Sequence, residues 1–115
     1  MAREIERARW ESFIKEFSER NRARATRLGV VRMEDGVEED FWIEDGLPLT
    51  GVDFEPDGDD APRVQIMLGG ESADARNLTH AVKRVRKLSQ EPDGGGLEIE
   101  SDDGSKTMLR FEAEN

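Results

Sequence analysis

The sequence predicts an α+β fold in which one N-terminal amphipathic helix packs on a mostly antiparallel sheet of about five to six strands. Three observations lead to this expectation. Apolar residues first follow a helical period, up to about residue 20. After that they alternate with polar residues in short runs, and clusters of Gly, Pro and Asp separate these runs. The 115 residues fit a single domain over residues 1–115.

The helix is expected over residues 3–20. Its apolar stripe has the spacing i, i+3, i+4 and i+7 and consists of Trp10, Phe13, Ile14 and Phe17. An isolated helix of this length is marginally stable in water, so the stripe should pack on the sheet. We therefore expect Phe13 and Phe17 to be mostly buried, and Arg9 and Glu16 to be exposed.

The strands are expected over residues 25–32, 40–44, 50–55, 63–68, 79–89, 97–101 and 106–112. Pro48 cannot donate a hydrogen bond to a neighbouring strand, so it indicates an edge or a corner of the sheet. Residues 63–68 should pair with residues 50–55 across an acidic loop. Residues 79–89 stay open between two interpretations, because they fit a helical stripe as well as a strand with a bulge near Arg84.

The last two strands form a hairpin whose register can be predicted. The Asp103-Gly104 pair is typical of a two-residue turn. A three-residue loop is favoured by burial, because it places four apolar side chains on one face: Leu97, Ile99, Leu109 and Phe111. This loop requires Gly104 to adopt a positive φ in a bulge. It also places Glu100 opposite Lys106, which predicts an ion pair.

The charge balance disfavours free nucleic acid as a general partner. The chain has 17 basic and 27 acidic residues and a net charge of −10, so its overall field repels phosphate. Only four of the bases are lysine. This composition favours a protein adapted to concentrated salt, in which screening relieves repulsion among carboxylates. A GC-rich bacterial source, which also prefers arginine to lysine, is the alternative.

The chemistry that the composition permits is narrow. The chain has no cysteine and one histidine, so disulfides, thiol catalysis and multi-histidine metal sites are excluded. No apolar run is long enough for a membrane span, and the charged N-terminus is unlike a secretion signal, so a cytoplasmic location is expected. His80 lacks any recognisable triad partner, and the acidic and glycine-rich loops match no calcium or phosphate motif. We expect no catalytic residue, no cofactor and no metal.

Two sets of residues are candidates for binding. The basic candidates for contacts with an anion or a partner are Arg22, Arg24, Arg27, Lys83, Arg84, Arg86 and Lys87. The alternative is that these cations pair with the acidic block of residues 33–62, which holds no base. The aromatic candidates for an apolar pocket or a docking face are Trp10, Phe13, Phe17 and Trp42.

The order of several short motifs resembles that of a known family. These motifs run from the helix stripe through Leu47-Pro48-Leu49, Leu78-Thr79-His80 and Val85-Arg86 to Leu97–Ser101 and Leu109-Arg110-Phe111. They are similar to a small bacterial family catalogued as domain of unknown function five-three-three-five. Similar sequences are strand-like after Leu-Thr-His, although this chain lacks the proline often found there. The resemblance implies a strand over residues 79–89 and carries no activity.

The leading hypothesis is an acidic cytoplasmic protein that works as a non-catalytic interaction or structural domain. It would act through protein contacts, with an unknown partner or as a homodimer. The alternative is a domain that binds a small molecule or an anion, and nucleic-acid binding through the Arg and Lys clusters ranks below both. An enzyme should have a concave pocket that holds His80 and convergent polar groups. A ligand-binding domain should have an apolar cavity under the helix, lined by Trp10, Phe17 or Trp42.

Overall fold

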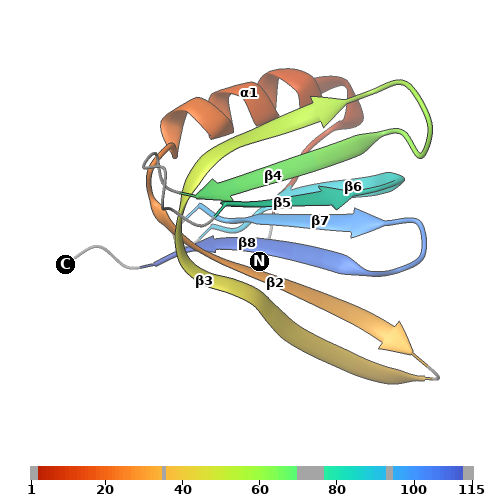
Figure 1. Cartoon of the computed structure of the whole chain (residues 1–115). Coiled ribbons are helices and arrows are strands. Elements are labelled where there is room, and N and C mark those ends of the chain that lie inside the picture. The colour runs from red at the N-terminus through yellow and green to blue at the C-terminus, as the bar shows by residue number, and fades with distance from the viewer. Residues whose placement is uncertain (1–2, 35, 70–76, 93–94, 113–115) are drawn as a thin grey trace.

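The structure is a computed structural model that describes residues 3–34, 36–69, 77–92 and 95–112. Within these residues one helix packs on an antiparallel sheet of eight strands in the order β1-β6-β7-β8-β2-β3-β4-β5 (Figure 1). The elements are β1 (Arg3–Glu4), a 3₁₀ turn (Arg7–Arg9), α1 (Trp10–Arg20), β2 (Ala25–Glu34), β3 (Val37–Glu55), β4 (Arg63–Gly69), β5 (Asn77–Val82), β6 (Val85–Gln90), β7 (Leu97–Ser101) and β8 (Lys106–Phe111). The α+β class is confirmed, but the expected five to six strands are too few.

The longest strand, β3, joins the two halves of the sheet. Its first half pairs with β2, and its second half pairs with β4 from Leu49 onward. Pro48 lies where β3 changes partner, which confirms the expected corner. The chain bends there without a break, so the separate strands expected over residues 40–44 and 50–55 are one strand. Figure 1 shows β3 curving upward to lie beside α1.

The N-terminal segment corrects the expected start of the helix. Arg3 and Glu4 pair with the end of β6, and the backbone N–H of Ile5 donates to the carbonyl of Leu88 at 2.8 Å. The indole Nε1 of Trp10 donates to the carbonyl of Ile5 at 2.8 Å and turns the chain into the helix. The α-helix therefore begins at Trp10 and not at residue 3, because pairing with a distant strand satisfies the first residues.

The helix stripe packs as expected. Phe17 is buried and Phe13 is partly buried, while Arg9 and Glu16 are exposed. The helix approaches β3 closely at Gly51, where an added Cβ would lie 3.3 Å from Oγ of Ser18. Oγ of Ser18 accepts a hydrogen bond from the backbone N–H of Val52 at 2.9 Å. This contact fixes α1 along the second half of β3.

Residues 77–90 form two strands, so the helical interpretation of this segment is wrong. β5 pairs with β4, and β6 pairs with β7. The turn between them places Arg84 at a φ of +49°, where its N–H donates to the carbonyl of Asp60 and its carbonyl accepts from the N–H of Asp102. Both strands exchange backbone hydrogen bonds with an adjacent strand, and this pairing is not visible in local periodicity.

The predicted register of the last hairpin is confirmed. Leu97 pairs with Leu109 and Glu100 pairs with Lys106. Gly104 has a φ of +91°, as the three-residue loop requires. The predicted ion pair is wrong in its partner, because the carboxylate of Glu100 lies 2.9 Å from Nε of Arg86 on β6.

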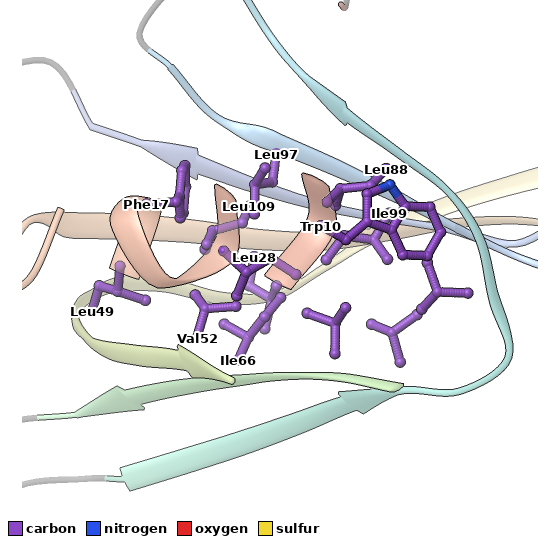
Figure 2. Packing of buried hydrophobic residues seen from close by; sticks show 14 of the residues in the cluster. Trp10, Phe17, Leu28, Leu49, Val52, Ile66, Leu88, Leu97, Ile99 and Leu109 are labelled. Carbon is purple, nitrogen blue, oxygen red and sulfur yellow. The ribbon is translucent and has the colours of Figure 1, made fainter. Parts of the chain in front are cut away.

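The core lies between α1 and the inner face of the curved sheet (Figure 2). Every strand except β1 contributes at least one buried or partly buried apolar side chain to it. The labelled members in Figure 2 are Trp10, Phe17, Leu28, Leu49, Val52, Ile66, Leu88, Leu97, Ile99 and Leu109. No helix in the described part of the chain is long and apolar enough to cross a membrane.

Candidate functional site

The basic candidates fall into two groups on separate parts of the sheet. The group at the start of β2 comprises Arg22, Arg24 and Arg27. The group along the β5–β6 turn and β6 comprises Lys83, Arg84, Arg86 and Lys87. Because β7 and β8 separate β6 from β2 in the sheet, the two groups do not form one row of cations on neighbouring strands.

The cations of the β5–β6 turn face an acidic loop. Asp60 lies 3.7 Å from Nζ of Lys83 and 3.3 Å from Nη1 of Arg84. Asp60 belongs to the acidic block 33–62, so here the cations pair with that block, as the alternative interpretation expected. More than half of each basic side chain is exposed, so these pairs contribute little stability.

The remaining basic candidates have other neighbours. Arg86 lies beside Glu100, and Nζ of Lys87 lies 3.8 Å from the carboxylate of Glu4, outside the acidic block. The guanidinium of Arg24 lies over the ring of Phe111, at 4.2 Å from its centroid. None of these arrangements gathers several cations around one point within the described residues, so they do not form an anion site.

The aromatic candidates separate into core and surface. Trp10 and Phe17 are each 3% exposed. The ring of Trp10 packs edge-on against Phe54 at 6.1 Å, and the ring of Phe17 lies 5.8 Å from that of Phe111. Other aromatic side chains therefore pack against both rings under the helix, where a ligand-binding domain was expected to have an apolar cavity. Trp42 is 43% exposed and lies on the outer face of the sheet.

The outer face around Trp42 forms the first candidate site. We call it the tryptophan face and define it as Arg27, Trp42, Asp45, Met108 and Arg110. The register skips Ile43 between Leu28 and Gly29, and this bulge places Trp42 beside Gly29 on the outer face. Gly29 is buried and contributes no side chain of its own to this face.

Two guanidinium groups lie over the indole of Trp42. The Cζ atoms of Arg27 and Arg110 lie 4.2 Å and 6.0 Å from the centroid of its ring. The side chain of Arg27 also lies 3.4 Å from the carboxylate of Asp45. A hydrogen bond with Asp45, helped by weak desolvation and repulsion, raises the pKa of the exposed Glu112 carboxyl. The tryptophan face therefore carries an aromatic ring with charges of both signs around it.

The second candidate site is a cavity of about 240 Å³ at one end of the sheet. We call it the histidine pocket and define it by His80, Ser101, Asp103, Ser105 and Thr107. Lys83, Arg84 and Asp102 also line it. These residues come from β5, from the β5–β6 turn and from the β7–β8 hairpin, which the fold brings together.

The polar groups of the histidine pocket have distinct states. Burial lowers the pKa of His80 below its ordinary value of 6.5, which favours the neutral imidazole. Its Nε2 lies 3.5 Å from Oγ1 of Thr107. Hydrogen bonds from the hydroxyl and the backbone N–H of Ser105, at 2.7 Å and 2.9 Å, lower the pKa of Asp103. Asp103 is therefore firmly ionised near neutral pH.

The histidine pocket meets the first requirement of an enzyme and lacks the second. It is concave and holds His80 with convergent polar groups, as an enzyme would require. A catalytic base also needs a third group that orients it, and among the described residues none makes a hydrogen bond to the second ring nitrogen of His80. Nor do the described residues place three or more potential metal-binding side chains together.

Sequence reasoning missed the histidine pocket, although it carried a signal. His80, Ser101 and Thr107 occupy positions where the alternation of each strand calls for an apolar residue. The three residues lie in separate parts of the chain, so only the order of the strands shows that they meet. One of the glycine-rich loops, at residues 69–70, lies partly outside the described residues.

Comparison with known proteins gives one match. The model of a family of unknown function, DUF5335, matches residues 1–115, which is the whole chain. The match confirms the resemblance that the order of motifs indicated. No curated protein and no solved structure matches the chain.

Proposed function

Because the chain belongs to the DUF5335 family, whose function is unknown, we propose its function from its own surface: a non-catalytic interaction domain that contacts a protein partner through the tryptophan face. One observation carries this proposal. Of the two tryptophans, Trp10 is 3% exposed and Trp42 is 43% exposed. Tryptophan and arginine supply a large share of the binding energy in protein interfaces, and Arg27 and Arg110 flank Trp42.

The tryptophan face is a better docking surface than the helix. The apolar stripe of α1 packs against the sheet of the same chain, so little of its surface is available for contact with a partner. Trp42 is covered in part by the guanidinium groups of Arg27 and Arg110, and 43% of its surface stays exposed.

The partner that best fits this face is a second copy of the chain. The face contains Arg27 and Arg110 together with Asp45, and Glu112 lies beside Asp45. In a two-fold dimer each patch meets itself, so cations of one copy can face carboxylates of the other. The crowded carboxylates of Asp45 and Glu112 would gain most from a partner's arginine.

The test is the oligomeric state of the purified protein by sedimentation velocity over a wide range of concentration. We expect a dimer that forms at high concentration in the wild type and in Glu16→Ala, whose exposed side chain lies on the outer side of α1. Trp42→Ala should remain monomeric with an unchanged melting temperature. A wild-type protein that stays monomeric at every concentration would show that a second copy is not the partner. A Trp42→Ala variant that dimerises as strongly as the wild type would show that the tryptophan face is not the interface.

A cross-linking experiment separates these two failures. A photoreactive amino acid replaces Trp42 in one protein and Glu16 in a control, and both are irradiated in the cells that produce them. An adduct of twice the chain mass at position 42 alone supports the dimer. An adduct of another mass at position 42 alone would support the tryptophan face as the interface and show that the partner is a different protein. Equal adducts at both positions overturn the proposed function.

A further inference from the structure

The inner face of the sheet changes character at the histidine pocket. Along β5, β7 and β8 the residues that point inward are apolar except for one in each strand: His80, Ser101 and Thr107. Ser101 is 7% exposed and Thr107 is 4% exposed. A buried hydroxyl destabilises a fold unless it finds a hydrogen-bond partner. Two hydroxyls and an imidazole at one place on an otherwise apolar face therefore call for a reason other than stability.

The described residues satisfy these polar groups poorly. The distance of 3.5 Å between Nε2 of His80 and Oγ1 of Thr107 is at the upper limit for a hydrogen bond. The backbone N–H and carbonyl of Ser101 both bond within the β7–β8 turn, to Ser105 and Gly104. Its hydroxyl bonds to no other described residue. The contrast is Thr26, whose buried hydroxyl donates to the carbonyl of Leu47 at 2.7 Å.

The charged side chains around the pocket indicate what kind of ligand group could bond to His80, Ser101 and Thr107. The basic side chains at the mouth of the pocket, Lys83 and Arg84, are matched by two acidic ones, Asp102 and Asp103. Both basic side chains also lie beside Asp60. The lowered pKa of His80 adds no positive charge near neutral pH. A charged ligand would lose its hydration without gaining an unmatched opposite charge.

We propose that the histidine pocket binds a small uncharged polyhydroxy compound, whose hydroxyl groups bond to His80, Ser101 and Thr107. A hydroxyl both donates and accepts, so adjacent hydroxyls on one ligand can satisfy the imidazole and the two side-chain hydroxyls together. Val30 lines the same cavity and can contact the carbon skeleton. The volume of about 240 Å³ is below that of typical drug-sized sites, which limits the ligand to about one sugar ring.

The test is a titration of the ¹⁵N-labelled protein followed by NMR. The uncharged probes are myo-inositol and D-glucose, and the anionic probe is inorganic phosphate. We expect saturable shifts of the amides of His80, Ser101 and Thr107 with at least one uncharged probe. Ser101→Ala and Thr107→Val should each weaken binding about tenfold or more, the equivalent of one lost hydrogen bond. Thr79→Val is the matched control, because it removes a hydroxyl from an exposed position of β5.

Thermal melting without probe gives a second readout. Ser101→Ala should melt at the same temperature as the wild type or higher, because it removes a hydroxyl that makes no hydrogen bond to any other described residue. A lower melting temperature would show that this hydroxyl supports the fold, and would overturn the inference. Saturable shifts with phosphate alone would show that the pocket binds an anion and would overturn the uncharged ligand. The absence of any saturable shift with all three probes would reject the pocket as a ligand site.

Discussion

The part of the inner face that α1 covers and the histidine pocket are built by the same strands and follow different rules. Under the helix, Leu97 and Leu109 pair across β7 and β8, and both are fully buried. Toward the β7–β8 turn the same strands place Ser101 and Thr107 inward. The first region is apolar and filled, whereas the second is polar and holds a cavity. The difference shows that alternation predicts where side chains point, and that departures from it mark a candidate site.

The largest expected effect lies under the helix. Phe17→Ala removes a side chain that is 3% exposed, and should lower the free energy of unfolding by about 3–5 kcal/mol. This is a large share of the roughly 5–15 kcal/mol that a small domain commonly has. Urea denaturation measures it, with Glu16→Ala as the exposed control on the same helix. A nearly unchanged stability for Phe17→Ala would mean that the helix contributes little to the covered region, and the comparison would fail.

A second prediction compares the hydroxyls of two buried residues, Thr26 and Ser101. The hydroxyl of Thr26 donates to the carbonyl of Leu47 at 2.7 Å. Thr26→Val leaves that carbonyl without its partner, and should lower the free energy of unfolding by about 1–3 kcal/mol. Ser101→Ala should cost nothing or stabilise the protein, because no described residue bonds to its hydroxyl. Equal losses for the two variants would show that the pocket hydroxyl supports the fold as the covered one does.

The sequence predicted the elements whose form depends on local burial. The register of β7 and β8 follows from which side chains must share a face, and the corner at Pro48 follows from its missing donor. The first residues were assigned wrongly to the helix because their partner, β6, lies far along the chain. Residues 77–90 fitted two periods, and only pairing with β4 and β7 decides between them.

The candidate sites depend on the same distant contacts. Trp42 was recognised as a candidate from its residue type alone, but its outward direction depends on the bulge at Ile43, which the sequence does not show. The histidine pocket required three separate segments to meet. Local periodicity therefore finds the core more readily than the sites, because each site is assembled across strands that are distant in the sequence.

The smallest expected effect is a pH dependence that belongs to the histidine pocket. Burial lowers the pKa of His80 below 6.5 in the folded protein, so the unfolded chain takes up the proton first as the pH falls. The contribution of His80 to the free energy of unfolding should therefore decrease as the pH falls below about 6.5, and should level off below its folded pKa. The charged groups that line the same pocket are Lys83, Arg84, Asp102 and Asp103.

The measurement is urea denaturation of the wild type and of His80→Gln between about pH 8 and about pH 5.5, the range in which a histidine titrates. The many carboxylates affect both proteins alike, so the difference between their free energies of unfolding isolates His80. The lowered pKa of Asp103 keeps this neighbour ionised throughout the range. We expect the free energy of unfolding of the wild type to fall relative to that of His80→Gln as the pH is lowered. A constant difference would show that the pKa of His80 is the same in the folded and the unfolded chain, and a shift in favour of the wild type would show that folding raises it. Either result would remove the contrast between a closed core and a desolvated polar pocket.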